Sequence, residues 1–128
     1  MIRALIIDDE TSTIQVLRIL IQRFIPEISE IHTAHGGLDG LEKVRSLKPD
    51  LVFLDIEMPE LDGFELLRQI PEPDFEVIFV TAYSHYAIQA IRFSAFDYIL
   101  KPVDTNELRN AVMRFISQKK QMNNFGQR

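Results

Sequence analysis

Short apolar runs alternate five times with segments of helical periodicity, and this alternation constrains the fold more than any other feature of the chain. The predicted strands are residues 2–7, 30–34, 51–54, 76–80 and 96–100. The helical patterns that follow them are residues 11–24, 38–47, 64–70, 85–93 and 104–116. The run Leu51–Leu54 is wholly apolar, which is typical of a strand covered on both faces. Strands joined by helices rather than hairpins predict an α/β fold with a parallel sheet.

The expected topology is flavodoxin-like. In this doubly wound fold, the parallel sheet has the strand order 2-1-3-4-5 and carries helices on both faces. Residues 1–118 are predicted to form this single domain. The chain turns polar from Ser117, so residues 119–128 are expected to be a fraying helix or the start of a linker. Two helix starts are also predicted, with Ser84 capping one helix and Asp104 opening a capping box with Glu107.

Composition limits the kinds of partner. The 128 residues carry a net charge of −5 and include no cysteine, which excludes disulfides and thiolate sites. The acidic balance argues against nucleic-acid binding by this segment, because nucleic-acid phosphates require clustered Lys and Arg. The apolar runs are far shorter than the ~20 residues that cross a membrane. We therefore expect a cytoplasmic domain that does not enter the membrane.

Polar residues stand where four of the apolar runs end. Asp8-Asp9 follow the first run, Asp55 the third, Thr81 the fourth and Lys101 the fifth. Because the carboxyl ends of parallel strands meet at one edge of the sheet, these side chains are predicted to share a crevice. Carboxylates, a hydroxyl and an ammonium together can hold a divalent cation and a phosphoryl group.

Three of these residues, Asp8, Asp9 and Asp55, form a predicted cation site. Carboxylates held close together raise one another's pKa, and a bound cation relieves the repulsion. Oxygen ligands with water completing the shell favour Mg²⁺. The alternative is that Asp8, Asp9 and Glu10 only complement the dipole of the first helix. The acid Asp55 and the cation Lys101 at other strand ends favour the metal site.

Asp55 is also a candidate nucleophile, since a carboxylate that attacks a phosphoryl group forms an aspartyl-phosphate. Lys101 and the cation would neutralise phosphoryl charge, and Thr81 could donate its hydroxyl to a phosphoryl oxygen. Pro102 has two interpretations. It either ends the last strand or forms a cis bond that turns Lys101 into the crevice, and cis X-Pro bonds are uncommon.

Four motifs in their order and spacing resemble the receiver domain of bacterial two-component response regulators: IIDDE, LVFLDIEMPELDGFE, VIFVTAY and YILKP. The resemblance runs from Ile2 to about Ile116. It implies that Asp55 is the phosphoacceptor, that a sensor histidine kinase is the partner, and that Asp8 and Asp9 bind Mg²⁺. It further implies a metal ligand in the backbone carbonyl of Glu57. The remaining implied features are the phosphate-binding pair Thr81 and Lys101, the switch residue Tyr98, and a cis Lys101–Pro102 bond.

The segment TAYSHYAIQAIRFSAFDYILKP is similar to receivers that precede LytTR-type DNA-binding domains. DNA would then be bound only by a C-terminal domain outside this chain. Phosphorylation could draw in Thr81 and turn Tyr98 inward, which would reshape the face built from residues 84–93, 96–100 and 104–116 and promote a homodimer. The aromatic side chains expected on or near this face are Tyr86, Phe93 and Phe96, of which two are expected to have a core role and the third to contribute a dimer contact. Tyr83 is expected to screen the aspartyl-phosphate from water.

Two other functions use similar residues. A haloacid-dehalogenase-like phosphatase also has an aspartyl nucleophile, a Thr, a Lys and Mg²⁺, but a second Asp follows two residues after its nucleophile, where this chain has Glu57. We therefore expect no enzyme. A pseudo-receiver that is regulated by contacts without phosphate is the second alternative.

Overall fold

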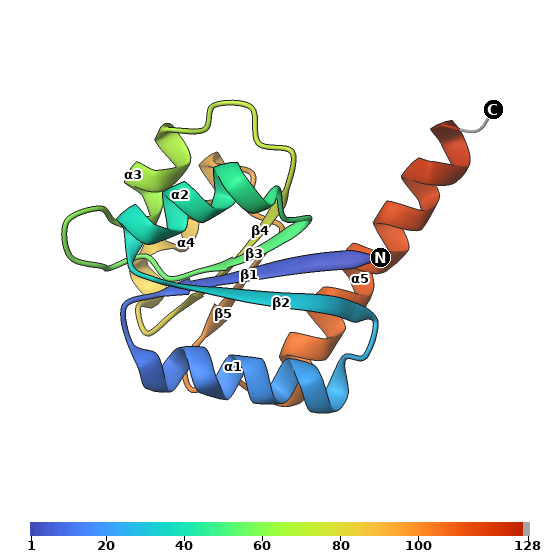
Figure 1. Cartoon of the computed structure of the whole chain (residues 1–128), viewed down its shortest axis with the longest axis horizontal. Coiled ribbons are helices and arrows are strands. Elements are labelled where there is room, and N and C mark those ends of the chain that lie inside the picture. Colours follow the sequence, from blue (N-terminus) through green and yellow to red (C-terminus); the bar gives the residue numbers. More distant parts are fainter. Residues whose placement is uncertain (127–128) are drawn as a thin grey trace.

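The sheet has the predicted topology. In the computed structural model, which describes residues 1–126 with side chains through Asn123, five parallel strands lie in the order β2-β1-β3-β4-β5. The strands are β1 (Ile2–Asp8), β2 (Ile28–His35), β3 (Leu51–Leu54), β4 (Glu76–Thr81) and β5 (Asp97–Leu100). Their carboxyl ends all point to the left in Figure 1. The flavodoxin-like prediction is therefore confirmed.

Helices cover both faces of the sheet (Figure 1). The helices are α1 (Thr11–Phe24), α2 (Gly37–Leu47), α3 (Gly63–Arg68), α4 (Ala87–Arg92) and α5 (Thr105–Gly126), with a 3₁₀ turn at Ser84–Tyr86 before α4. Strand side chains alternate between two cores. Ala4 and Ile6 pack on the side of α1 and α5, whereas Leu5 and Ile7 pack on the side of α2, α3 and α4. Burial on both sides explains why these strands read as continuous apolar runs.

The helix caps differ in part from expectation. The Asp104 carboxylate accepts the Glu107 backbone N–H at 2.9 Å, as the sequence predicts. Ser84 does not cap a helix: it lies inside the 3₁₀ turn, and α4 starts after Tyr86 without a side-chain cap. A complete capping box that the sequence analysis missed joins Asp62 and Glu65 at the start of α3, with hydrogen bonds of 2.8 and 2.9 Å.

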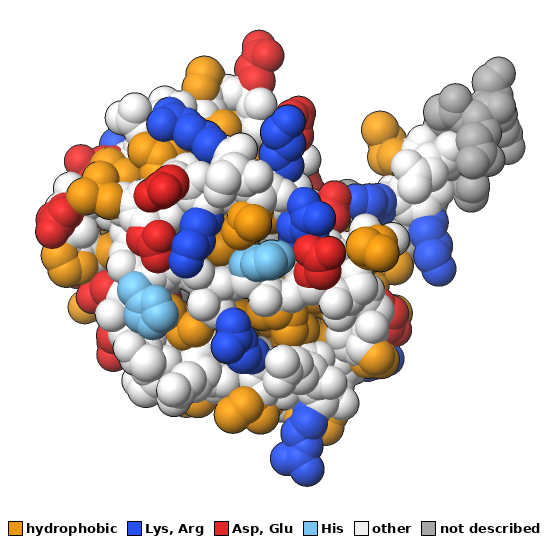
Figure 2. All heavy atoms as spheres, in the orientation of Figure 1, with side chains coloured by type: hydrophobic (Ala, Val, Ile, Leu, Met, Phe, Trp, Pro, Cys, Tyr) orange, Lys and Arg blue, Asp and Glu red, His pale blue; other side chains and the backbone are white. Residues whose placement is uncertain are grey.

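The polar tail is helical as far as the structure describes it. Helix α5 runs without a break from Thr105 to Gly126, and its last turns stand clear of the body of the molecule (Figures 1 and 2). Lys119 anchors the helix where it leaves the body, because its ammonium lies 2.8 Å from the Asp50 carboxylate. Residues 127–128 of the predicted tail lie outside the described residues. None of the described helices is long and apolar enough to cross a membrane.

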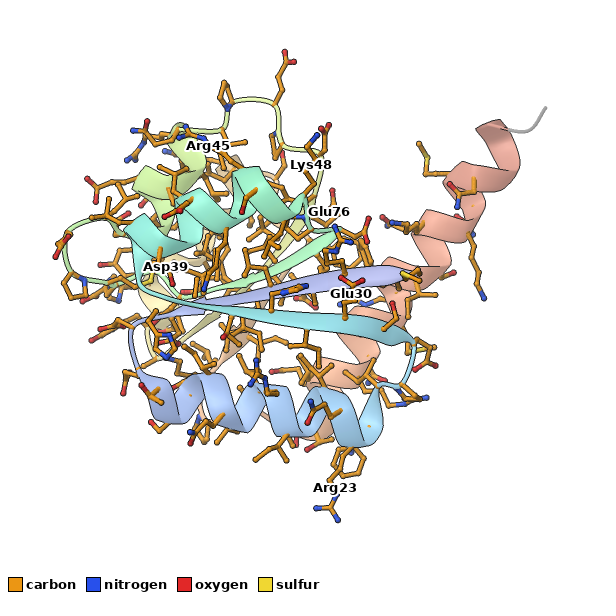
Figure 3. The ribbon with its side chains drawn as sticks, viewed as in Figure 1. Arg23, Glu30, Asp39, Arg45, Lys48 and Glu76 are labelled. Atoms are coloured by element: carbon orange, nitrogen blue, oxygen red, sulfur yellow. The ribbon has the colours of Figure 1, made fainter. Side chains whose placement is uncertain are left out.

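The two ends of the strands form two different edges. At the amino edge, Lys48 directly after α2 lies close to Glu76 at the start of β4 in the view of Figure 3, whereas Asp39 lies toward the opposite edge. A hollow of about 680 Å³ at the amino edge is lined by Arg45, Lys48 and Asp50 among others. The predicted site residues lie at the carboxyl edge instead.

Candidate phosphorylation site

The carboxyl edge brings the predicted site residues together. Asp8 and Thr81 are the last residues of β1 and β4, and Asp55 and Lys101 directly follow β3 and β5. Ladder hydrogen bonds continue one residue beyond the strands. The Asp55 N–H donates to the Ile7 carbonyl at 3.0 Å, and the Lys101 N–H donates to the Thr81 carbonyl at 2.8 Å. The sheet itself therefore fixes the backbone of both residues.

Lys101 joins the two buried carboxylates. Its Nζ lies 2.9 Å from a carboxylate oxygen of Asp8 and 3.2 Å from one of Asp55, with Glu10 farther away at 3.7 Å. Burial alone would lower the pKa of Lys101, but the hydrogen bonds and negative charges of Asp8 and Asp55 outweigh it and leave that pKa raised. Lys101 is therefore a fixed positive charge between the two acids. The Lys101–Pro102 peptide bond is cis.

The acids form a compact oxygen cluster. Carboxylate oxygens of Asp8, Asp9, Glu10 and Asp55 lie within 4.8 Å of one another. Burial raises the pKa of Asp8 to about 6, and the nearby charge of Asp55 acts in the same direction. All the possible ligand atoms in this cluster are oxygens, and the carboxylates outnumber the nearby ammonium of Lys101. Such a set of ligands fits Mg²⁺. At the start of α1, Glu10 makes no side-chain cap bond, whereas the Asp8 carboxylate accepts the Glu10 backbone N–H at 2.9 Å, so Asp8 contacts the helix start as well as the acid cluster.

Thr81 and Tyr98 are linked through Tyr83. The Thr81 side chain is fully buried, and its Oγ1 accepts the Tyr83 N–H at 3.4 Å. The Tyr98 hydroxyl donates to the carbonyl oxygen of Tyr83. The Tyr98 ring, which is half-buried, packs against Phe79 with centroids 6.1 Å apart. A displacement of Thr81 would thus reach β5 through a single residue.

Glu57 makes a contact that the sequence analysis missed. Its carboxylate accepts a hydrogen bond of 3.0 Å from the Tyr86 hydroxyl. The loop that carries Glu57 closes tightly, because the Gly63 N–H donates to the Ile56 carbonyl at 2.8 Å. A Cβ at Gly63 would lie 2.4 Å from the Asp55 carbonyl oxygen, so only glycine fits there. The adjacent pair Asp62-Gly63 was the available sequence signal for this turn.

The comparisons with known proteins agree with this geometry. The family model of the response regulator receiver domain matches residues 4–113. The chain belongs to this family. Among solved structures, the regulatory domain of MrkE from Klebsiella pneumoniae has a TM-score of 0.84 at 31% identity and covers 93% of this chain and 98% of its own. Response regulator TrrA from Thermotoga maritima, in complex with Mg²⁺ and BeF, has a TM-score of 0.78 at 37% identity, covering 89% and 98%.

Curated relatives of the receiver are longer proteins. An uncharacterized response regulatory protein of Vibrio cholerae is 48% identical over 121 residues, which are 94% of this chain and 51% of the relative. The transcriptional regulatory protein BtsR of Escherichia coli is 37% identical over 115 residues, which are 89% of this chain and 48% of BtsR. The receiver thus spans about half the length of the curated relatives it matches.

On the face built from α4, β5 and α5, all three expected aromatic side chains have core contacts, where a core role was expected for two of them. Tyr86, Phe93 and Phe96 are only partly exposed and pack against the cores. Phe64 of α3 holds two of them, with ring centroids 5.8 Å from Tyr86 and 5.2 Å from Phe93. The exposed apolar side chains of this face are aliphatic: Ile88 at 70%, Ile91 at 73% and Leu100 at 43%.

Proposed function

We propose that this receiver is a phosphorylation-driven switch in which Asp55 accepts a phosphoryl group from a sensor histidine kinase. The observation that carries the proposal is the position of the Lys101 ammonium, within 3.2 Å of both Asp55 and Asp8 beside a cluster of acids. The Asp55 carboxylate can act as the nucleophile, and the Lys101 ammonium beside it can neutralise charge on the phosphoryl group. The acids outnumber this one ammonium, so a bound cation can add positive charge for the transfer. The domain is not proposed to be an enzyme that acts on a separate substrate.

The transfer needs few protein groups. A lone pair of an Asp55 carboxylate oxygen forms the new bond to phosphorus. The bond between phosphorus and the donor, a phosphohistidine nitrogen or the oxygen of an acyl phosphate, breaks, and its electron pair leaves with the donor. Lys101 neutralises charge on the transferred group, and the Thr81 hydroxyl can donate a hydrogen bond to one of its oxygens. No general base is required, because the attacking group is a carboxylate and carries no proton that must be removed.

Mg²⁺ is the proposed cofactor. Asp8, Asp9 and Asp55 would hold it together with the backbone carbonyl of Glu57, and it would supply further positive charge to the phosphoryl oxygens. The similarity to TrrA, whose structure contains Mg²⁺ and BeF, supports this proposal. The raised pKa of Asp8 supports it as well, since a bound cation would favour the charged form of that acid.

The output is proposed to be transcription regulation in the cytoplasm. BtsR, which is named as a transcriptional regulatory protein, is about twice as long as this chain. A solved structure of a DNA-binding response regulator of the LuxR family from Staphylococcus aureus is 27% identical with a TM-score of 0.76. We propose that DNA is bound by a C-terminal domain absent from this chain. We propose the LytTR type for it, because the segment from Thr81 to Pro102 resembles receivers that precede LytTR-type domains.

Phosphorylation is proposed to promote a homodimer through the face of α4, β5 and α5. The link from Thr81 through Tyr83 to Tyr98 supports a path from the phosphoryl group to β5. The exposed Ile88 and Ile91 give this face apolar surface that a second copy can cover.

Replacement of the phosphoacceptor tests the proposal. With acetyl phosphate and Mg²⁺, intact-mass measurement should show one added phosphoryl group on the unchanged protein and none on Asp55→Asn. Asp74→Asn is the matched control, because it removes one exposed carboxylate at the amino edge, far from Asp55. This variant should be labelled as strongly as the unchanged protein. Labelling of Asp55→Asn at another residue would refute the assignment.

A further inference from the structure

The hydrogen bond between Tyr86 and Glu57 joins the start of α4 to the loop that follows the phosphoacceptor. The Tyr86 hydroxyl lies 3.0 Å from a carboxylate oxygen of Glu57. The two side chains line a shallow hollow of about 400 Å³ together with Met58, Pro59 and Asp62. The hydrogen bond to the Glu57 carboxylate raises the pKa of the Tyr86 phenol.

Tyr86 is held firmly by its neighbours. Its ring centroid lies 4.2 Å from that of His85, 5.8 Å from that of Phe64 and 6.2 Å from that of Tyr83. Phe64 is buried and belongs to the core beneath α3. The hydroxyl of Tyr86 is therefore presented from a packed ring, whereas the Glu57 side chain that it binds is exposed. Of the two partners, Glu57 is the one that would move if the bond were lost.

The direction in which Glu57 would move matters for the acidic cluster. The cluster already contains four carboxylates, Asp8, Asp9, Glu10 and Asp55, and Lys101 is the ammonium that lies among them. Glu57 follows Asp55 by two residues but is not a member of that cluster. A fifth carboxylate there would attract a cation and repel an incoming phosphoryl donor, because both effects follow its negative charge.

We propose that Tyr86 is a positioning residue that holds the Glu57 carboxylate outside the acidic cluster and so keeps the approach to Asp55 open for the phosphoryl group. This inference rests on the proposed function of Asp55. It assigns a role to the Glu57 side chain that is separate from the metal ligand implied for its backbone carbonyl.

The experiment removes only the hydroxyl, with Tyr86→Phe. Released Glu57 should bind Mg²⁺ together with the cluster, so the Mg²⁺ dissociation constant, measured by titration calorimetry with MgCl₂, should fall by about threefold, the effect of one modest hydrogen bond. The initial rate of labelling by acetyl phosphate, measured by intact mass at saturating Mg²⁺, should fall by a similar factor of about three. Tighter cation binding with slower labelling is the expected signature.

Second-site variants separate this role from a merely structural one. In a Glu57→Gln background, which removes the charge, Tyr86→Phe should change neither measurement. In a Glu60→Gln background, which removes an exposed charge from the same loop, Tyr86→Phe should keep its full effect. Weaker cation binding together with slower labelling, no change in either quantity, or an effect that survives Glu57→Gln would each overturn the inference. If the unchanged protein is not labelled at all, the proposed function fails, and the Mg²⁺ titration still decides the role of Tyr86.

Discussion

The Lys101 ammonium lies 2.9 Å from the Asp8 carboxylate, and only 16% and 2% of the two side chains are exposed. An ion pair of nearly the same length, 2.8 Å, joins Lys119 to Asp50 at the amino edge, where 37% and 31% of the side chains are exposed. The two pairs differ mainly in their access to solvent. Because solvent screens exposed charges, the pairs should differ strongly in their contribution to stability.

Lys101→Met should destabilise the metal-free protein. The substitution leaves Asp8 and Asp55 without their cation, and we expect the free energy of unfolding to fall by about 2 kcal/mol, less than for a fully buried pair because Lys101 is partly solvated. Mg²⁺ should reduce the difference, since it supplies positive charge to the same acids. Urea unfolding followed by circular dichroism, with and without Mg²⁺, measures both effects.

Lys119→Met is the matched control for this prediction. It should cost less than about 1 kcal/mol, and its effect should not depend on Mg²⁺. Equal losses for the two variants, or a Lys101→Met effect that Mg²⁺ leaves unchanged, would contradict the account of the site.

The pH dependence of stability should carry the signature of Asp8. Burial raises the pKa of this acid from 3.8 to about 6. The folded protein therefore holds the proton more tightly than the unfolded chain, so Asp8 contributes stability below pH 3.8 that is lost as the pH rises through about 6. Without metal at about pH 7.5, Asp8→Asn should exceed the unchanged protein in stability by about 2 kcal/mol, a value discounted for solvent screening.

The comparison of the two proteins isolates this acid. Asp39 and Asp50 have lowered pKa values and lose stability as the pH falls, but they are present in both proteins. The advantage of Asp8→Asn should disappear near pH 4 and should reverse when Mg²⁺ is added at about pH 7.5. A pH-independent difference between the melting curves would argue against a strained carboxylate at this position.

The arrangement of the site was predictable because it follows from the sheet. The spacing of apolar residues predicts each strand and helix from its local sequence. Parallel strands then bring their carboxyl ends to one edge of the sheet, regardless of the helices and loops that connect them. The sequence alone therefore groups Asp8, Asp55, Thr81 and Lys101 at one edge. The predicted helix cap at Ser84 was wrong, because a 3₁₀ turn occupies Ser84–Tyr86 and α4 begins only at Ala87.

Contacts made between loops were not predictable. The bond from Tyr86 to Glu57 depends on how α4 is rotated about its axis, and no local pattern reports that rotation. The rotation is set by Phe64, which draws Tyr86 and Phe93 inward and leaves Ile88 outside. The sequence therefore predicted the face that contains α4 and a core role for two of its aromatic side chains, but it did not indicate Ile88 and Ile91 as exposed residues of that face.

Tyr83→Ala should shorten the lifetime of the phosphoryl group on Asp55. The ring of Tyr83 is 41% exposed, whereas its backbone carries the hydrogen bonds to Thr81 and Tyr98. The substitution removes the ring and keeps both backbone bonds, so we expect the lifetime to fall roughly threefold as water gains access to the phosphoryl group. Decay of the phosphorylated mass after removal of acetyl phosphate gives the lifetime. Tyr83→Phe keeps the ring and should keep the lifetime; an unchanged or longer lifetime in Tyr83→Ala would count against the screen.

The last prediction concerns the dimer. Ile88 and Ile91 are exposed on one helix, so replacing both with Asp should leave the monomer folded while placing charge in the proposed contact. Burial of an isoleucine is worth about 2 kcal/mol, and each substitution is present in both copies of the homodimer. Each should therefore weaken the dimer formed with beryllofluoride and Mg²⁺ by roughly 1,000-fold. Sedimentation velocity measures the dimer directly.

The control for the dimer is Ile19→Asp on α1, where the side chain is 53% exposed but lies outside the proposed face. This variant carries the same change of an exposed isoleucine to a charge, so it accounts for any general effect on solubility or net charge. It should dimerise like the unchanged protein. If the dimer survives the double substitution on α4 but is lost in Ile19→Asp, the dimer interface lies on α1 and not on α4. The two helices can be told apart in this way because they pack on opposite faces of the sheet.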